Sequence, residues 1–479
     1  MKAGTSGNAV AAESRTSSSP QPGARAIGRA SSTGSLVAGF AGFLLAGPAA
    51  LAQTMPQGFE KIEHVVVLYL ENRSFDHLFG NFPGAEGLDK AGAAAIQTDE
   101  TGKPYETLPD PLDLRPKTPV RYARLPETLP NRPFRLNDFY GLDEQLGSLV
   151  HAFYQQQAQI NGGKMDRFVQ ESDAKGYAMA YWDGSSLKMY ELAKRFTLAD
   201  NFFHAAFGGS FLNHLWLVCA CSPLYPNAPE KIVAKLDSTG KLVEDGFVTP
   251  DAYGINTMEP VGGPYGHRTK PERLLPVQTK PTIGDRLTEK GVSWAWYSGG
   301  WNEAEAGKEG ENFSYHHQPF AFFANYQKGQ PGRANLKDLD DFLADIEAGR
   351  LPSVSFYKPR RGINQHPSAS TVLTSDAHAA DIVARLEKSP QWGKMVVIVT
   401  YDENGGFWDH VAPPVRDRWG PGTRVPTLIV SPFAKKGFVD HVSYDTTAVL
   451  KLIETRFGVA PLTEADAKAP LMSNAFEFN

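Results

Sequence analysis

Short apolar runs alternate with segments of helical spacing along most of the chain. The apolar runs are rich in Val, Ile and aromatic residues, which is typical of strands buried in a sheet. They cover residues 64–70, 292–298, 352–357, 395–401 and 425–431. The segments with apolar residues three and four apart cover residues 211–220, 282–291, 336–349, 379–388 and 445–458. This order predicts an α/β fold, a three-layer αβα sandwich with a mostly parallel central sheet.

Two stretches interrupt this alternation. Residues 85–135 are too rich in proline for core elements, and residues 223–280 contain a hairpin pattern at 231–244 before a run rich in Gly and Pro. We interpret both stretches as loop-rich insertions in one large domain that extends over residues 53–479.

The N-terminal segment has the pattern of a signal peptide. Residues 1–34 carry four basic residues against one acid, and residues 36–52 are apolar but interrupted by Gly and Pro. Small residues precede Gln53, so we expect cleavage after Ala52 and not a transmembrane anchor. The sequence therefore predicts a periplasmic or secreted protein.

The net charge argues against one class of partner. Cleavage after Ala52 would remove four positive charges and one negative charge, which changes the formal net charge from −5 to about −8. Such a chain has no basic field to attract nucleic acid, so we expect no nucleic-acid partner.

The two cysteines, Cys219 and Cys221, are only two positions apart. Because the ring that such a pair would close is small and strained, we expect no useful disulfide between them. A zinc ribbon is also excluded, since the sequence has no second cysteine pair.

Acidic side chains follow two of the predicted strands at the point where each strand ends. Glu71 and Asn72 follow the first strand, and Asp402 and Glu403 follow the strand at 395–401. In open parallel sheets, ligands bind beyond the carboxyl ends of the strands, and oxygen ligands suit a divalent cation. The alternative reading is that these acids cap helices or pair with Arg73 and Arg424, which are also in the sequence.

A Gly-Gly-Ser turn precedes the segment of helical spacing at 211–220. Gly208 and Gly209 allow a sharp turn, which places Ser210 at a helix start, where free N–H groups suit a phosphate. Ser210 could instead be an N-cap and nothing more. Four loop histidines add candidate chemistry, and they are His151, His316, His317 and His366.

Several motifs together resemble the bacterial phosphoesterase family of acid phosphatases and phospholipases C. They are "ENRSFDHLFG", "NGGKMD", "FGGSFLNH", "YDENGGFWDHVAPP" and "RVPTLIVSPFAKKGFV", and they run in family order from about residue 62 to residue 457. The resemblance implies an alkaline-phosphatase-like fold and metal-assisted phosphoryl transfer.

The resemblance also implies roles for individual residues. One divalent metal ion would be ligated by Glu71, Asn72, Asp402, Glu403 and the nucleophile Ser210. Asn213 and His151 would contact the substrate phosphate, and the catalytic histidines would be His151, His316, His317 and His366. His77 and His410 lie in family motifs as well, and we interpret them as supporting residues. Oxygen ligands favour Ca or Mg, and Zn remains an alternative.

The resemblance favours the compact acid phosphatase branch, because the chain ends some twenty residues after the last predicted helix, at Asn479. We therefore expect an exported hydrolase that cleaves small phosphomonoesters through a phosphoserine, with a pocket histidine that protonates the leaving alcohol. Protonated histidines around the phosphate would make activity best at mildly acidic pH.

Three alternatives accompany this prediction. A phospholipase C would apply the same chemistry to phospholipid headgroups. A sulfatase is excluded, because the "CSPLY" segment at 221–225 lacks the required Arg. A non-catalytic exported protein that binds phosphate or a cation would not require a nucleophile at Ser210. The sequence leaves the oligomeric state open.

Overall fold

The central sheet forms the middle layer of the protein. The structure, a computed structural model, describes residues 55–308 and 313–478. Within them, eight strands lie in the order β13, β12, β14, β1, β15, β16, β6 and β17. Their bounds are Leu336–Lys337, Trp294–Ser298, Val354–Lys358, His64–Leu70, Met395–Tyr401, Thr427–Val430, Thr197–Ala199 and Phe438–Asp440. β16 pairs antiparallel with β15 and β6, and the other pairings are parallel, which confirms the mostly parallel sheet.

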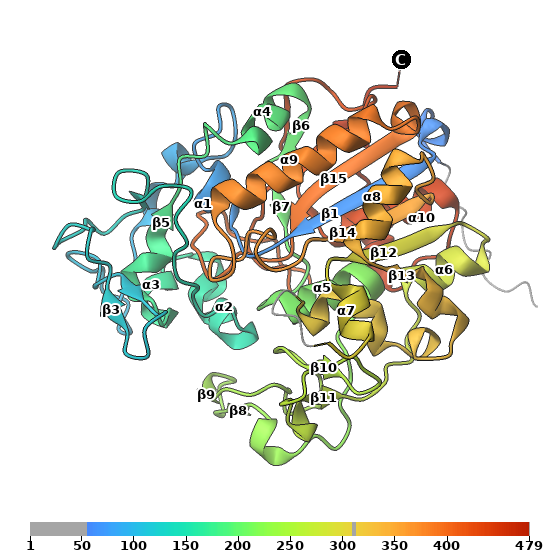
Figure 1. Ribbon diagram of the computed structural model, residues 1–479. Helices are drawn as coiled ribbons and strands as arrows, with labels where there is room; N and C mark the ends of the chain where they lie inside the picture. The colour runs from blue at the N-terminus through green and yellow to red at the C-terminus, as the bar shows by residue number, and fades with distance from the viewer. Residues whose placement is uncertain (1–54, 309–312, 479) are drawn as a thin grey trace, which may run out of the picture. The chain divides into compact units, whose positions relative to one another are not determined.

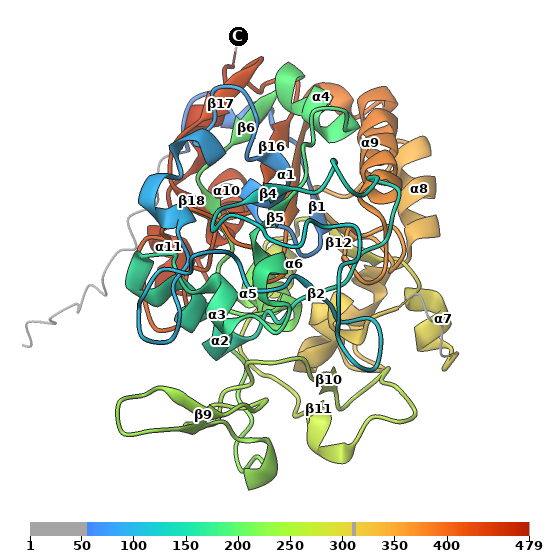
Figure 2. The ribbon, with the colours of Figure 1, turned by 90° about the vertical axis from the view of Figure 1, so that its left-hand side faces the viewer.

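Helices cover both faces of the sheet (Figures 1 and 2). One face carries α4 (Lys188–Arg195), α8 (Leu339–Glu347) and α9 (Val372–Lys388), which contact one another in the order α4, α9, α8. The opposite face carries α5 (Ser210–Cys219), α6 (Ile283–Glu289) and α10 (Thr447–Phe457), with α5 in contact with both of the others. The predicted αβα sandwich is therefore confirmed. Because both faces are covered, every residue of β1 after His64 and all of β15 are buried.

Loop-rich segments extend from this sandwich. Residues 85–135 contain no α-helix. They form two 3₁₀ helices (Leu88–Lys90 and Gly92–Ala95) and the short strands β2 (Leu112–Asp113), β3 (Val120–Arg121) and β4 (Phe134–Arg135). In residues 223–280, β8 (Lys235–Leu236) and β9 (Leu242–Glu244) form the predicted hairpin. The remaining short elements are α1 (Phe75–Phe79), α2 (Phe153–Ile160), α3 (Phe168–Glu171), α7 (Trp301–Glu305), α11 (Glu464–Lys468), β5 (Ala180–Tyr181), β7 (Phe202–Phe203), β10 (Glu259–Pro260), β11 (Leu274–Leu275) and β18 (Tyr444–Asp445).

The expectation about the cysteines is wrong. Cys219 and Cys221 form a disulfide, with their Cα atoms 5.1 Å apart. Ala220, between them, has a left-handed backbone with φ 46° at the C-terminal end of α5. This turn brings the two side chains to the same side of the chain, at a Cα separation that a disulfide spans without backbone movement.

The predicted signal peptide, residues 1–52, lies outside the described residues. Residues Gln53–Asn479 form one compact unit by their internal contacts. No helix in the described part of the chain is long and apolar enough to cross a membrane.

Candidate active site

The ends of two neighbouring strands bring the acidic residues together. β1 and β15 are parallel with Leu70 opposite Tyr401, so the residues that follow each strand emerge side by side. The backbone N–H of Asn72 donates to Asp402 Oδ1 at 3.0 Å, and the Asn72 side-chain amide donates to Glu403 Oε1. Asn72 adopts a left-handed backbone with φ 61°, which turns its side chain toward β15. Residues more than 300 positions apart thus share one buried cluster.

Ser210 lies against this cluster from a third segment. It is the first residue of α5, and Gly209 is the N-cap, so Ser210 is not itself the cap. Its hydroxyl donates toward Asn72 Oδ1 at 3.4 Å and Glu403 Oε1 at 3.3 Å. The geometry therefore favours the interpretation of Ser210 as a reactive residue over the N-cap alternative.

The turn before Ser210 depends on Gly208. Its φ is +87°, and a Cβ there would lie 2.7 Å from the backbone nitrogen of Phe153. Only glycine fits this close approach without strain, and the turn then directs the Ser210 hydroxyl at the acids.

Asn213 lies below this turn and not in the cavity wall. Its amide donates to the carbonyls of Ala206, Gly208 and Gly209, and its Oδ1 accepts from the backbone N–H of Ala206. Both ends of the side chain thus hold the backbone of the turn. Contact between Asn213 and phosphate stays a prediction.

The four sequence-selected histidines lie around the cluster. His317 is buried, and its Nε2 contacts Glu71 Oε1. His151 donates from Nδ1 to the Leu149 carbonyl at 2.6 Å, so its Nε2 accepts from the Asn72 amide at 3.1 Å. His151, His316 and His366 line a cavity of about 510 Å³ together with Ser210.

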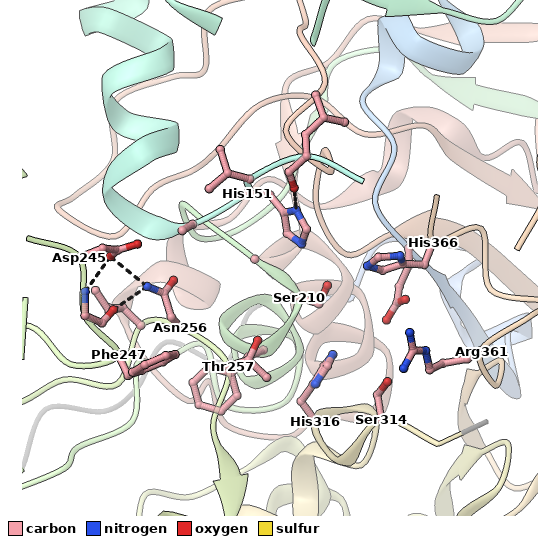
Figure 3. A pocket seen from close by; sticks show the side chains of 18 residues that line it. His151, Ser210, Asp245, Phe247, Asn256, Thr257, Ser314, His316, Arg361 and His366 are labelled. Atoms are coloured by element: carbon pink, nitrogen blue, oxygen red, sulfur yellow. Dashed lines mark hydrogen bonds between the residues drawn. The ribbon is translucent and has the colours of Figure 1, made fainter. Parts of the chain in front are cut away.

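The cavity has two unlike sides. Figure 3 shows Ser210 near the centre, with His151, His316, Arg361 and His366 around it. The other side in this view is formed by residues 245–257 of the second insertion, among them Asp245, Phe247 and Asn256.

Sequence reasoning missed four residues in or beside the cluster. Lys358 Nζ lies 3.2 Å from Glu71 Oε1, and Asn364 donates to Glu71 Oε2 at 2.6 Å. His214 Nδ1 donates to the Ser210 carbonyl at 2.7 Å, and Arg361 lines the cavity. The available signals were the lysine at the end of the strand next to β1 and the position of His214 one helical turn after Ser210.

The alternative reading of the acids is wrong. Arg73 donates to the Gln365 carbonyl and contacts His77 Nε2, and Arg424 pairs with Asp409 and Asp76. Among the described residues, neither arginine side chain pairs with Glu71, Asp402 or Glu403, and Arg73 contacts the cluster only through its backbone N–H, which donates to the Glu403 carbonyl at 3.0 Å. Within the same network His410 pairs with Asp76, and both His77 and His410 are buried away from the cavity.

Burial and mutual repulsion perturb the acids. Burial raises the pKa of Asp402 to about 7, with a further increase from Glu71, and burial together with Asp402 raises the pKa of Glu403 well above its usual value. Burial also acts to raise the pKa of Glu71, but His317 and Lys358 outweigh it and hold that pKa well below its usual range. Without a further cation beside them, Asp402 and Glu403 therefore favour their protonated forms.

Burial has the opposite effect on the histidines. It lowers the pKa of His366 to about 3 and that of His316 well below its usual value, and it lowers the pKa of His151 and His317 as well. Without a bound phosphate, burial thus favours the neutral form of each ring. That protonated histidines surround the phosphate stays a prediction.

The cluster fits a divalent cation. It offers oxygen atoms from Glu71, Asn72, Asp402, Glu403 and Ser210, which are the donors that hard cations prefer. Asp402 Oδ2 is fully buried and accepts no hydrogen bond from the described residues. Ligand atoms of Glu71, His214 and Asp402, and likewise of Glu71, His316 and His317, lie close enough together to hold a metal ion.

Comparison with known proteins identifies the class. The model of the Phosphoesterase family matches residues 62–460, so the chain belongs to that family and is a hydrolase that acts on phosphoric ester bonds. Phospholipase C B of Mycobacterium tuberculosis is 28% identical over 480 residues, which cover 88% of this chain and 79% of that protein. Non-hemolytic phospholipase C of Burkholderia pseudomallei is 27% identical over 451 residues, which cover 83% of this chain and 55% of that protein.

Similarity to solved structures is lower. A protein in the alkaline phosphatase superfamily from Vibrio parahaemolyticus shares 12% sequence identity and a TM-score of 0.34. The match covers 67% of this chain and 68% of that one.

Proposed function

We propose that the protein is an exported acid phosphatase that hydrolyses small phosphomonoesters through a phosphoserine at Ser210. The observation that carries this proposal is the Ser210 hydroxyl at the head of α5, in contact with Glu403 and open to the cavity. A hydroxyl in this place combines an adjacent proton acceptor with the N–H groups of a helix N-terminus.

The residues of the chain supply most of the chemistry. Glu403 Oε1 accepts the Ser210 proton at 3.3 Å as Ser210 Oγ attacks phosphorus in line with the leaving oxygen. The oxygen–phosphorus bond to the alcohol breaks as the bond to Ser210 forms. Water then attacks the phosphoserine from the side that the alcohol has left and loses a proton to His366. The bond between phosphorus and Ser210 Oγ breaks, and Glu403 returns its proton to that oxygen, which releases phosphate and restores the hydroxyl.

His366 is placed to serve the leaving group. The backbone N–H of Ser368 donates to its Nδ1 at 3.3 Å, so the proton of the neutral ring is on Nε2. A dianionic phosphate in the cavity would raise the pKa of His366 from its low value, so that the ring takes up a second proton on Nδ1, within 3.0 Å of Ser368 Oγ. The imidazolium then gives its Nε2 proton to the departing oxygen and returns to the neutral form.

One divalent cation would be held by oxygen atoms of Glu71, Asn72, Asp402, Glu403 and Ser210. Because every donor atom is oxygen, this set of ligands suits Ca or Mg better than Zn. Such a cation, when bound, stabilises negative charge on the Ser210 oxygen and on the phosphoryl oxygens.

Arg361 favours a phosphomonoester over a diester. It lines the cavity beside His366, and it forms no ion pair or hydrogen bond with the described residues. A monoester dianion carries more charge than a diester monoanion, so a free guanidinium stabilises it more. The second candidate is a phospholipase C, which the names of the relatives favour.

The choice between the two candidates can be tested with one substrate pair. The wild-type kcat/KM should be larger for p-nitrophenyl phosphate than for p-nitrophenylphosphorylcholine near pH 6. Arg361→Met should lower the monoester value about tenfold or more and change the diester value less. Arg360→Met is the matched control. Arg360 directly precedes Arg361 in the sequence and is exposed, but it does not line the cavity. A tenfold preference of the wild type for the choline diester would assign the protein to the phospholipases C.

The proposed location is the periplasm or the medium. The disulfide between Cys219 and Cys221 supports it, because disulfides persist in oxidising compartments. N-terminal sequencing of exported protein should give a start near Gln53, and a start before residue 40 would contradict the proposed cleavage.

A further inference from the structure

A lysine is buried within the acidic cluster. Lys358 is the last residue of β14, the strand next to β1, and none of its surface is exposed. Its Nζ lies 3.2 Å from Glu71 Oε1, 3.8 Å from Asp402 Oδ2 and 3.4 Å from the Leu70 carbonyl. The side chains at the ends of the adjacent strands β14, β1 and β15 thus meet, and the ammonium of Lys358 lies between the carboxylates of Glu71 and Asp402.

The groups around this ammonium resemble a second metal site. Glu71, His214 and Asp402 offer ligand atoms that all lie within 4.8 Å of one another. The rings of His214 and His317 are nearly parallel, with centroids 5.4 Å apart. His214 Nε2 and His317 Nδ1 are buried, and neither has a hydrogen-bond partner among the described residues. The nitrogen of His214 that faces Asp402 is Nδ1, 3.9 Å from Asp402 Oδ2, and the nitrogen of His317 that faces Glu71 is Nε2. Two carboxylates and two imidazoles are a donor set of the kind that accepts Zn²⁺ or Mn²⁺.

Lys358 occupies the carboxylate edge of that donor set. A buried charge requires a partner of opposite sign, and here the partners are the same Glu71 and Asp402 oxygen atoms that a second cation would need. When all three carboxylates of Glu71, Asp402 and Glu403 are ionised, as ligands of a cation must be, they carry three negative charges, and Lys358 neutralises one of them. One divalent cation would neutralise the remaining two, whereas a second divalent cation would leave the cluster positively charged.

We propose that Lys358 is a fixed cation in the place of a second metal ion, and that it limits the site to one divalent cation. This inference rests on the proposed metal-dependent hydrolysis. Lys358 is a positioning residue in this role, because it contacts ligands of the cation and not the substrate.

Counting bound Mn²⁺ tests the inference without any measurement of turnover. Wild-type protein is stripped with a chelator and titrated with Mn²⁺, and free Mn²⁺ is followed by electron paramagnetic resonance. We expect one Mn²⁺ per chain for the wild type and two for Lys358→Met, with the first ion bound about tenfold or more tightly in the variant because a nearby positive charge is gone. Lys451→Met is the matched control: Lys451, on α10, is also buried, but it donates to the Ala467 carbonyl of α11. This control should bind one ion with wild-type affinity.

A second variant covers the case in which Lys358→Met fails to fold. Lys358→Met combined with Glu71→Gln removes one charge of each sign, so the double variant should fold and bind one Mn²⁺. Two ions on the wild type would overturn the inference. A folded Lys358→Met variant that binds no ion, or that binds one ion at wild-type affinity, would also overturn it. A double variant that does not fold would overturn it as well. Retained turnover in Ser210→Ala would overturn the proposed mechanism and leave these ion counts unchanged.

Discussion

The hydroxyl of Ser210 contacts an amide oxygen from one strand end and a carboxylate from the next. A serine in water is a weak nucleophile, so its reactivity depends on these neighbours and on a bound cation. The oxygen atoms that surround it come from residues that the sequence singles out, because acids directly after buried strands are unusual enough to notice.

Ser210→Ala should lose almost all turnover and keep its fold. Loss of the covalent route should lower kcat by at least about a thousandfold, or ~4 kcal/mol of barrier. Steady-state assays with p-nitrophenyl phosphate and circular dichroism check both statements. Ser222→Ala is the control, since Ser222 is buried and accepts from Trp216 Nε1 away from the cluster. A Ser210→Ala variant with more than about a tenth of wild-type kcat would show that Ser210 is not the nucleophile.

Metal affinity should weaken as the pH falls below about 7. The pKa of Asp402 is about 7, so its proton must leave before the carboxylate can ligate a cation. Protons therefore compete with the metal for this carboxylate at acidic pH. Isothermal titration with Mg²⁺ or Mn²⁺ at pH 5.5 and 7 should give an affinity that rises with pH. An affinity that does not change between pH 5.5 and pH 7 would contradict this.

The turn that begins α5 determines the geometry of the site at the scale of elements. Gly208 approaches the backbone of Phe153 in α2, and Asn213 holds the same turn from inside the helix. The turn, α2 and α5 therefore act as one unit that fixes the direction of the Ser210 hydroxyl.

Gly208→Ala should disrupt this unit. The added Cβ would lie 2.7 Å from Phe153 N and 2.8 Å from Phe153 Cα, at a φ that alanine rarely adopts. We expect a loss of about 1–3 kcal/mol in stability and a fall in kcat of about tenfold or more. Thermal melting and kinetics measure the two effects. Gly240→Ala is a control for the backbone strain alone, because Gly240 also has positive φ but open space around it. Equal effects on kcat in the two variants would contradict a special role for this turn.

Long elements were predictable and short ones were not. The strands at 64–70 and 395–401 agree with β1 and β15, since six consecutive buried residues in β1 and seven in β15 produce a clear apolar run. β6 and β17 have three residues each and β13 has two, so no periodicity exists at that length and only neighbouring strands make them part of the sheet. The disulfide was missed because it depends on the left-handed backbone at Ala220, which residue type does not predict.

The oxygen ligands of the site were predictable from the sequence, and the buried lysine beside them was not. Glu71 and Asp402 are visible in sequence because a carboxylate ends an apolar run. Lys358 also ends a strand, but a lysine at such a position usually points to solvent, and only the sheet order shows that it is buried between those two acids.

At the scale of the whole molecule, the buried acid Glu454, far from the cluster in sequence, makes the stability of the protein depend on pH. Glu454 in α10 is 3% exposed, and burial together with Asp466 raises its pKa to about 9. Because the folded pKa is above the unfolded value, the stability that this group contributes is fully present below about pH 4.5 and is lost as the pH rises toward 9.

Glu454→Gln should therefore stabilise the protein at pH 8 and have little effect at pH 5. The gain at pH 8 should be about 2 kcal/mol or more, because the variant needs no proton uptake on folding. Melting temperatures of both proteins at the two pH values provide the measurement. Glu464→Gln, at an exposed position of α11, is the control and should change stability by less than about 0.5 kcal/mol. A Glu454→Gln variant that is no more stable at pH 8 than at pH 5, relative to wild type, would contradict the raised pKa.

The two unlike sides of the cavity have a consequence for how such a protein can diversify. Strand ends and α5 supply one side, and residues 245–257 of a loop-rich insertion supply the other. Sequence changes in the insertion can reshape the space for the alcohol and leave the Ser210 hydroxyl and the acids in place, because the acids follow strands of the sheet and Ser210 begins α5. Mutations in the part of the gene that encodes the insertion can thus change which substrates fit, with little effect on the residues that carry out the reaction.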